Sequence, residues 1–223
     1  MAKFTRIQVA QRMAESGFIP VFFHPDLETA QQVLKACYEG GCRVFEFTNR
    51  DALAHEVFGE LKKYAVRELP EMMLGIGTVI DAPTAALYMQ LDADFVVSPI
   101  VSEEMAKVCN RRKVMWIPGC ATLSEMLYGL ELGAEVVKAF PAGQLGGPAF
   151  VKAVKAPCPW ISIMPTGGVT PDETNLRAWF EAGVTCVGMG SQMIPQDVIK
   201  NKDFATLTQK VKEVVEIIQK IKN

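Results

Sequence analysis

The chain has 223 residues, of which 49% are hydrophobic and 22% are charged, and its formal net charge is −2. This composition is ordinary for a globular protein with a large core, and the small negative charge argues against a nucleic-acid-binding surface. The apolar runs are too short to cross a bilayer, and residues 1–16 contain no continuous signal-peptide core. We therefore expect a cytoplasmic protein of one domain, residues 1–223, with neither a membrane nor a nucleic-acid partner.

The first 40 residues predict a helix, a strand and a second helix. Apolar side chains recur at helical spacing over residues 3–16, which predicts a short amphipathic helix that closes one end of a barrel. Residues 19–23 form a compact apolar run typical of a strand. Asp26 follows it and can cap a helix that continues to about Glu39.

The same strand-and-helix unit then recurs along the chain. Apolar strands that end in Gly, Pro, Ser or Thr alternate with helical patterns, such as those at residues 83–91, 102–110, 124–132, 148–154 and 172–182, and His55 also lies in a helical stretch. With the first strand this gives about eight parallel strands, which favours a single (β/α)8 TIM barrel of the α/β class with an extra N-terminal helix. A doubly wound open sheet is the alternative. Residues 204–222 predict a final amphipathic helix that packs on the body of the protein.

Cysteine and histidine show no metal-binding pattern in the sequence. The six cysteines lack CxxC spacing, and several stand in apolar segments, so we expect buried free thiols. The two histidines belong to no paired motif. His24 follows the first strand, where it could touch a ligand, and its role is left open.

One lysine interrupts an apolar strand pattern, EVVKAFPA at residues 135–142. Lys138 shares a strand face with Val136 and Phe140, because side chains alternate along a strand. Desolvation favours the neutral form of an amine, which can attack a carbonyl. Lys138 is therefore the leading candidate nucleophile. The alternative is a lysine at a strand end that points into solvent.

A glutamate interrupts another apolar strand, VFEFT. A charged Glu46 inside the protein would need a partner, so we expect it either to pair with Lys138 or to have a raised pKa. Either state suits general acid–base catalysis, and the alternative is a structural ion pair that fills the barrel. Arg50 follows the same strand and can bind a carboxylate or phosphate, or it can be a solvated arginine paired with Asp51.

Other polar or turn residues end the remaining strands and would converge on one face of a barrel. The sequences PTGGV and MGSQ end two successive strands, where Gly-rich turns commonly present N–H groups to a phosphate. GIGT lacks the third glycine of a dinucleotide fingerprint, so we interpret it as a strand end near the substrate. In PGCATLSE, Thr122 and Glu125 form a capping box with an ordinary structural role.

A buried lysine and glutamate beside a phosphate site define a specific chemistry. The lysine would add to the ketone of a 2-oxo acid and form an iminium that stabilises negative charge at C3. The glutamate, directly or through water, would move protons to and from the substrate. The result is reversible carbon–carbon cleavage.

These residues resemble a known family, the class I 2-keto-3-deoxy-6-phosphogluconate (KDPG) aldolases, including bifunctional members that also act on 4-hydroxy-2-oxoglutarate (KHG). The resemblance covers nearly the whole chain and rests on ordered sequences, namely FEFTNR, GIGTV, FVVSP, PGCATLSE, VVKAFPA, LGGPAF, PTGGV and VGMGS.

The resemblance implies a role for each matching residue. Lys138 would be the Schiff-base residue and Glu46 the proton-transfer residue; the substrate-binding residues would be Arg50, Thr78 and Pro99 at the pyruvate portion, Phe140 packed against the substrate, and Thr166, Gly167, Gly168, Gly190 and Ser191 at the phosphate. It also implies a homotrimer of (β/α)8 barrels that needs no metal or other cofactor. The products would be pyruvate with glyceraldehyde 3-phosphate, or pyruvate with glyoxylate.

Four positions depart from the commonest family pattern: Leu123, Asp51, Ile100 and His24. They rim the expected site and spare its lysine and glutamate, so the preferred aldehyde and the C4 stereochemistry are left open. Two other functions also fit the residues. One is a phosphate-binding barrel isomerase or synthase in which Lys138 only binds charge, and the other is a catalytically silent sugar-phosphate sensor.

Overall fold

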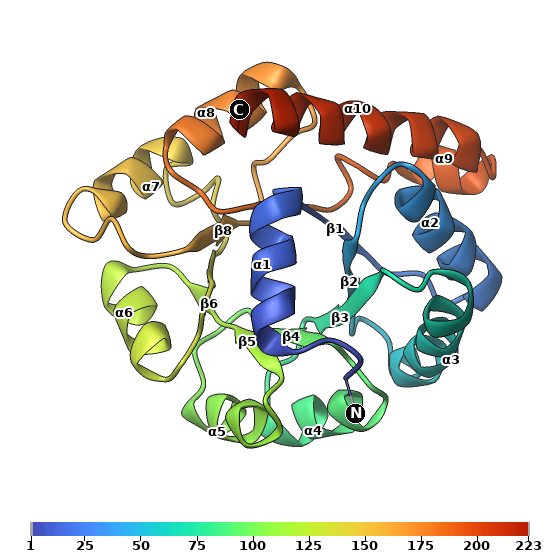
Figure 1. Ribbon diagram of the computed structural model, residues 1–223, viewed down its shortest axis with the longest axis horizontal. Coiled ribbons are helices and arrows are strands. Elements are labelled where there is room, and N and C mark those ends of the chain that lie inside the picture. Colours follow the sequence, from blue (N-terminus) through green and yellow to red (C-terminus); the bar gives the residue numbers. More distant parts are fainter. Residues whose placement is uncertain (1, 223) are drawn as a thin grey trace.

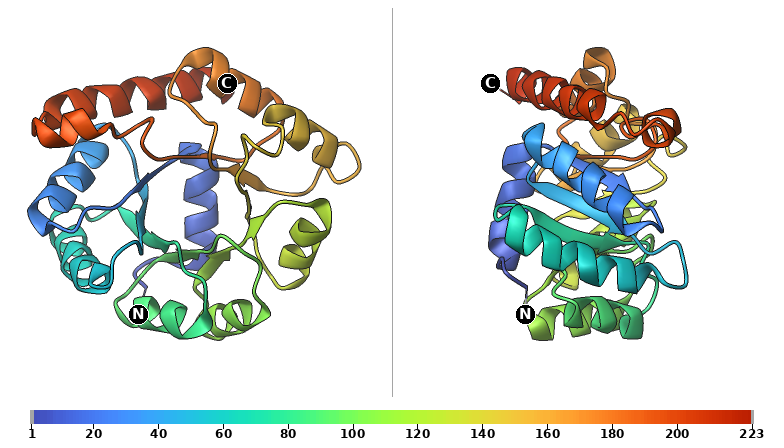
Figure 2. Two further views of the ribbon diagram at one scale, coloured as in Figure 1. Left: turned by 180° about the vertical axis from the view of Figure 1, so that it is seen from behind. Right: turned by 90° about the vertical axis from the view of Figure 1, so that its right-hand side faces the viewer.

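The structure is a computed structural model that describes residues 2–222, and it is an α/β fold built on curled parallel sheets. Six strands pair in the order β5-β4-β3-β2-β1-β9, and three more pair in the order β6-β7-β8. Helices surround the strands, and α1 crosses one end of them (Figures 1 and 2). The strands are β1 (Phe18–Phe22), β2 (Val44–Thr48), β3 (Met73–Gly77), β4 (Phe95–Val97), β5 (Met115–Ile117), β6 (Gly119–Cys120), β7 (Val137–Ala139), β8 (Ile163–Pro165) and β9 (Val187–Met189).

The helices follow the predicted alternation closely. They are α1 (Arg6–Ser16), α2 (Leu27–Glu39), α3 (Ala54–Glu68), α4 (Ala82–Gln90), α5 (Glu103–Arg112), α6 (Leu123–Glu131), α7 (Pro148–Lys155), α8 (Glu173–Glu181), α9 (Gln196–Lys200) and α10 (Phe204–Lys222). Side chains begin several of them as expected. Asp26 accepts a hydrogen bond from Thr29 N at the start of α2, and Thr122 and Glu125 form the predicted capping box at the start of α6. The short helix α9 was not predicted.

The fifth predicted strand is divided into β5 and β6 by Pro118. Because proline has no backbone N–H, it cannot donate to a neighbouring strand. The segment before it pairs with β4 and the segment after it pairs with β7, and the Pro118 carbonyl accepts the Lys138 N–H at 2.8 Å. Residues 115–120 thus connect the two sheets on one side.

On the other side, β8 and β9 are joined by fewer contacts. Thr166 and Gly188 form an isolated parallel bridge, and Thr185 N donates to Ile163 O at 2.9 Å. The strands therefore form one six-stranded and one three-stranded parallel sheet linked at their edges. Over residues 2–222 the structure shows curled parallel sheets, and not the full eight-stranded barrel that the sequence predicted.

The core consists of two clusters, one on each face of the strands. The inner cluster joins Val9 and Met13 of α1 to strand residues such as Ile19, Val44 and Met164. The outer cluster joins the alternate strand residues to the surrounding helices. This division follows from the two-residue period of a strand, and it confirms that α1 packs against one end of the strands.

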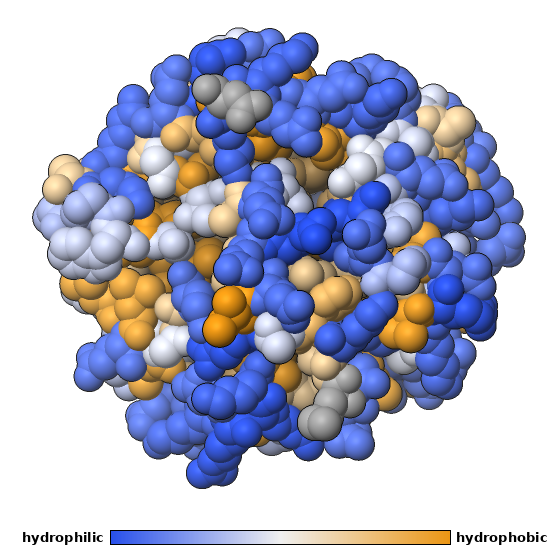
Figure 3. Space-filling model, viewed as in Figure 1, coloured by the Kyte–Doolittle hydropathy of each residue, from blue (hydrophilic) through white to orange (hydrophobic). Residues whose placement is uncertain are grey.

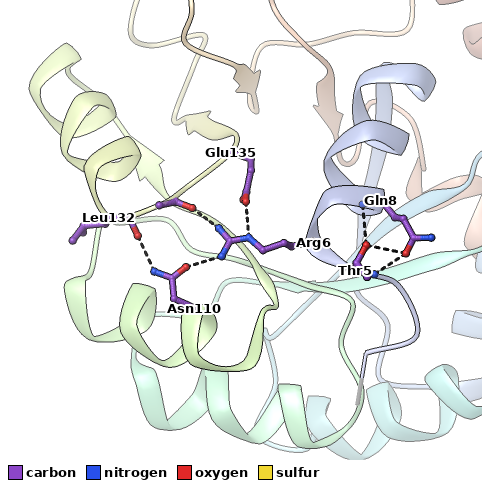
Figure 4. A network of polar contacts seen from close by, with 7 residues as sticks. Thr5, Arg6, Gln8, Asn110, Leu132 and Glu135 are labelled. Atoms are coloured by element: carbon purple, nitrogen blue, oxygen red, sulfur yellow. Dashed lines mark hydrogen bonds and ion pairs between the residues drawn. The ribbon is translucent and has the colours of Figure 1, made fainter.

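A partly exposed network of polar contacts holds α1 in this place (Figure 4). The Arg6 guanidinium contacts Glu135 Oε1 at 2.5 Å, Asn110 Oδ1 at 2.8 Å and the Gly133 carbonyl. These partners come from α5 and from the loop between α6 and β7. Ile7 is one of the apolar residues at helical spacing from which this helix was predicted, but it is 64% exposed, because it lies two residues, about 200°, from Val9 around the helix.

The surface on the α1 side is mostly hydrophilic, with scattered apolar patches (Figure 3). Among residues 2–222, no helix is both long enough and apolar enough to span a membrane. All six cysteines are buried and free, as predicted.

Candidate active site

Lys138 lies in the middle of β7 with its side chain buried. The residue is only 6% exposed, and its backbone is held by pairing with Gly119 of β6 and Met164 of β8. Its Nζ lies 4.9 Å from the centroid of the Phe140 ring, which is itself 36% exposed. The predicted interior position is confirmed, and the solvent-pointing alternative is wrong.

Glu46 lies in β2, and its carboxylate faces the Lys138 amine. The residue is 1% exposed, and its Oε1 is 3.9 Å from Lys138 Nζ. Its Oε2 is buried and has no hydrogen-bond partner within the described chain. Burial raises the pKa of Glu46 above its ordinary value, while the positive charges of Lys138 and Arg50 oppose the rise. Both sequence expectations, pairing with Lys138 and a raised pKa, are met together.

A second buried contact between a lysine and a carboxylate, Lys62–Asp94, is a tight structural ion pair in the same protein. Lys62 Nζ lies 2.5 Å from Asp94 Oδ2, which also accepts the Leu74 N–H at 2.9 Å. Each pair leaves one carboxylate oxygen, Glu46 Oε2 or Asp94 Oδ1, buried without a hydrogen-bond partner among the described residues. What distinguishes the Lys138–Glu46 pair is its length of 3.9 Å, which is too long for a direct hydrogen bond and leaves the amine and the carboxylate able to contact a ligand or water.

Arg50, Thr78 and Pro99 follow three neighbouring strands, β2, β3 and β4, at their carboxyl ends. Arg50 is exposed and acts on Glu46 through its charge. Thr78 has φ of 61°, a left-handed conformation that is unusual for a β-branched residue and is commonly found at functional sites. Arg50 and Asp51, both described in the structure, do not form the ion pair of the alternative interpretation. Asp51 Oδ1 instead accepts the Leu53 N–H at 2.9 Å.

The approach of Pro99 to the neighbouring strand depends on a glycine that the sequence interpretation did not single out. A Cβ on Gly119 would lie 2.4 Å from the Pro99 carbonyl carbon, so only glycine allows this contact. The available signal was the isolated glycine between Pro118 and Cys120 at a strand, which often marks a close backbone approach.

The predicted phosphate residues lie at the ends of β8 and β9. Thr166 bridges to Gly188, and its Oγ1 is buried without a hydrogen-bond partner in the described residues. Gly167 and Gly168 have φ of 90° and 80°, which suits glycine in a turn. The turn packs on the segment that follows β7, since Gly143 N donates to Gly167 O at 2.9 Å.

Gly190 and Ser191 stand directly after β9, and the Gly190 carbonyl accepts the N–H groups of Met193 and Ile194. Because β8 and β9 are adjacent, the two Gly-containing turns lie at neighbouring strand ends. His24 lies apart from these contacts. Its ring stacks on Phe22 and its Nδ1 accepts the Asp26 N–H at 3.1 Å, which is a local turn contact.

No group of three or more potential metal ligands is found within residues 2–222. The chemistry that the described side chains can perform is that of a buried amine beside a carboxyl group. Such a pair can add to a carbonyl and transfer protons.

The chain is similar to known proteins over most of its length. The family model described as "KDPG and KHG aldolase" matches residues 9–210. The KHG/KDPG aldolase of Escherichia coli K12 is 33% identical over 199 residues, which cover 89% of this chain and 90% of that protein.

Solved structures show the same similarity. A KDPG aldolase from Legionella pneumophila, with pyruvate captured at low pH as a covalent carbinolamine, has a TM-score of 0.83 and 30% identity, covering 92% of this chain and 97% of that one. A 2-keto-3-deoxy-6-phosphogluconate aldolase of Zymomonas mobilis ZM4 with 3-phosphoglycerate has a TM-score of 0.80 and 28% identity, covering 93% and 94%. Together with the family model, these relatives show that the chain belongs to the KDPG and KHG aldolase family.

Proposed function

We propose that this protein is a class I aldolase, a lyase that cleaves 2-keto-3-deoxy-6-phosphogluconate to pyruvate and glyceraldehyde 3-phosphate, and that it also cleaves 4-hydroxy-2-oxoglutarate to pyruvate and glyoxylate. The observation that carries the proposal is the buried Lys138 amine 3.9 Å from the buried Glu46 carboxylate, whose second oxygen is unpartnered. The family of the chain and the pyruvate carbinolamine of the Legionella relative support the same chemistry.

The reaction begins when the Lys138 amine attacks C2 of the 2-oxo acid and forms a carbinolamine. Loss of water gives an iminium, which withdraws electrons from the C3–C4 bond. Glu46, directly or through water, accepts the proton of the C4 hydroxyl as that bond breaks, and the aldehyde leaves. The resulting enamine takes a proton at C3, and water then releases pyruvate and the free amine.

The remaining predicted residues would hold the two ends of the substrate. Arg50, Thr78 and Pro99 would contact the pyruvate portion, because they follow β2, which contains Glu46, and the next two strands on one side of it, and the Arg50 guanidinium matches a carboxylate. Phe140 would pack against the carbon chain beside the Lys138 amine.

The phosphate would bind at the turns after β8 and β9, which contain Thr166, Gly167, Gly168, Gly190 and Ser191. Glycines in left-handed conformations leave backbone N–H groups accessible to an anion, and the unpartnered Thr166 hydroxyl adds a donor. The phosphorylated ligand of the Zymomonas relative is consistent with an anion site in this fold.

For the whole chain, we propose that residues 1–223 are one domain and that its strands close into a single (β/α)8 barrel. Residues 115–120 connect the two sheets on one side, and the Thr166–Gly188 bridge connects them on the other. We place the protein in the cytoplasm, where its six free buried thiols would remain reduced.

We further propose that the protein is a homotrimer. Three exposed apolar side chains support an interface at the rim of the strands: Leu53 at 56%, Ile80 at 60% and Ile100 at 46% exposure. They follow the neighbouring strands β2, β3 and β4, so a second copy of the chain would cover them together.

A turnover assay tests the function directly. Pyruvate release from KDPG and from KHG is measured side by side by coupling to lactate dehydrogenase and NADH, with the Lys138→Ala variant as the inactive control. We expect the wild-type protein to release pyruvate from both acids and the variant from neither. Ligand binding without turnover would instead identify a sugar-phosphate sensor, and ordinary activity in Lys138→Ala would exclude the Schiff-base mechanism.

A further inference from the structure

Gly77, the last residue of β3, lies directly against the carboxylate of Glu46. A Cβ placed on Gly77 would be 1.8 Å from Glu46 Oε1, 2.6 Å from its Cδ and 2.9 Å from its Cγ. These separations are far below van der Waals contact, so the carboxyl end of Glu46 occupies the volume that any other side chain would fill. The same Oε1 is the oxygen that faces Lys138.

Backbone conformation does not explain this glycine. Gly77 is not among the glycines with a positive φ, and it belongs to the regular parallel pairing of β2 with β3, opposite Thr48. The left-handed conformation occurs one residue later, at Thr78. Any residue could adopt the backbone of Gly77, so what distinguishes glycine here is the absence of a side chain.

If a side chain were added, Glu46 would have to move. The Gly77 carbonyl accepts the Asn49 N–H at 2.9 Å, and all five residues of β3 pair with β2. Because Glu46 is in β2 itself, the two backbones cannot separate without breaking this pairing. Rotation of the flexible glutamate side chain is easier, and it would carry Oε1 away from its position near the Lys138 amine.

We propose that Gly77 is a positioning residue for the aldol reaction: by lacking a side chain it creates the space that holds the Glu46 carboxylate beside Lys138. Gly77 does not touch the substrate in this role and acts only through Glu46. The inference rests on the proposed aldolase function for its catalytic consequence, whereas the steric contact itself can be tested without any substrate.

Gly75 provides a matched control on the same strand and the same face. A Cβ on Gly75 would lie 2.4 Å from two atoms of the Phe95 ring. Residue 75 must therefore also lack a side chain, in this case because its neighbour is an apolar ring. Alanine at either position therefore introduces a severe steric conflict. The three atoms nearest to a Cβ on Gly75 all belong to Phe95, whereas those nearest to a Cβ on Gly77 all belong to Glu46.

A stability cycle tests the contact. Thermal unfolding is measured for the wild type, Gly77→Ala, Glu46→Ala and the double variant, and the same set is made with Gly75→Ala. We expect Gly77→Ala to lower the melting temperature of the wild type by several degrees and to lower that of Glu46→Ala much less, because the truncated residue 46 leaves room for the new methyl group. Gly75→Ala should lower both by the same amount.

The cycle also covers a variant that does not fold. Recovery of folding in the double variant Gly77→Ala with Glu46→Ala would locate the conflict at the glutamate and support the proposal. If Gly77→Ala lowers the melting temperature of the wild type and of Glu46→Ala equally, or if neither Gly77→Ala nor the double variant folds, glycine is required by the strand itself and the proposal is wrong.

Kinetics test the catalytic consequence. Displacing a catalytic group by about 1 Å can cost on the order of 10²-fold in rate, so kcat of Gly77→Ala should fall by about that factor. Trapping of pyruvate on Lys138 by borohydride should change less, because it depends on the amine. In a Glu46→Gln background, Gly77→Ala should cause little further loss of kcat; independent, multiplicative losses would overturn the proposal.

Failure of the two proposals can be told apart. If the stability cycle shows coupling between residues 77 and 46 but the wild type neither traps pyruvate nor turns over, the contact is real and the aldolase function is wrong. If the wild type is an active aldolase and the cycle shows no coupling, only the positioning role of Gly77 is wrong.

Discussion

Two buried side chains, Lys138 and Glu46, determine the chemistry available to this protein. They come from strands far apart in the sequence, and the curled sheets bring their polar atoms within 3.9 Å. The amine and the carboxyl group are each almost fully removed from solvent. In such surroundings, small changes in position or charge have large effects on proton transfer, because the local dielectric is low.

Replacing Glu46 by glutamine should separate proton transfer from adduct formation. The amide keeps the shape of the side chain but cannot exchange a proton, so we expect kcat to fall by about 10²- to 10⁴-fold. Borohydride trapping of pyruvate on Lys138 should continue at least in part. Steady-state turnover and mass spectrometry of the trapped protein measure the two effects. Unchanged kcat would remove Glu46 from the mechanism.

The raised pKa of Glu46 also predicts a dependence of stability on pH. In the unfolded chain the Glu46 carboxyl has its ordinary pKa of 4.5, and in the folded protein its pKa is higher. Between these two pKa values the folded protein therefore binds more protons than the unfolded chain. The contribution of Glu46 to the free energy of unfolding is therefore fully present below pH 4.5 and decreases as the pH rises through the folded pKa.

Glu46→Gln removes this titration, so the stability of the variant relative to the wild type should increase with pH across the same interval. Urea unfolding at a series of pH values measures the difference. Parallel curves for the two proteins would show that burial does not raise the pKa of Glu46.

At the scale of the elements, α1 stabilises the end of the strands opposite to the proposed substrate residues. Val9 and Met13 enter the inner core cluster, while Arg6 reaches α5 and the α6–β7 loop through a network of hydrogen bonds (Figure 4). The polar and apolar contacts of α1 thus hold the same strands that carry Glu46 and Lys138.

Arg6→Ala should destabilise the protein by about 1–3 kcal/mol, since it removes charge-assisted hydrogen bonds and leaves the partly buried Glu135 without its cation. Arg177→Ala is the matched control, because Arg177 pairs with Glu173 on the exposed face of α8 and such pairs contribute less than about 0.5 kcal/mol. Urea unfolding compares the two variants. Equal losses would mean that the Arg6 network does not hold α1.

Local sequence patterns predicted most of these helices and strands, but not the residues at which each one begins and ends. The caps at Asp26 and Thr122 and the final helix depend on neighbouring residues and were predictable. The interruption at Pro118 depends on which strands lie on either side, and several strands contain only three residues, so their limits are set by pairing partners that a sequence does not reveal.

At the scale of the whole molecule, the approach of Lys138 to Glu46 followed from the barrel hypothesis, because the ends of parallel strands converge. The steric relation of Gly77 to Glu46 did not, since it depends on the rotamer of one side chain across two strands. Likewise, the sequence did not reveal that Ile7 is exposed or that His24 makes only local turn contacts among those described, and the structure was needed to show both.

The assembly is predicted to be a trimer with an interface at Leu53, Ile80 and Ile100. Light scattering should give a mass of three times the 24.5 kDa chain for the wild type and a smaller mass for Ile80→Asp, because a charge is costly in an apolar interface. Val66→Asp, at a half-exposed position on the outer helix α3, should keep the trimer mass. A monomeric wild type, or a trimer unaffected by Ile80→Asp, would contradict this interface.

The central claim is that Lys138 acts as a nucleophile toward a 2-oxo acid. The most direct measurement is to incubate the protein with pyruvate and sodium borohydride, digest it and locate the modified residue by mass spectrometry, with Lys138→Ala and the exposed Lys63→Ala as matched variants. The account predicts one reduced pyruvyl adduct, on Lys138, in the wild type and in Lys63→Ala, and none in Lys138→Ala. An unmodified wild-type Lys138, or an adduct that persists in Lys138→Ala, would contradict it.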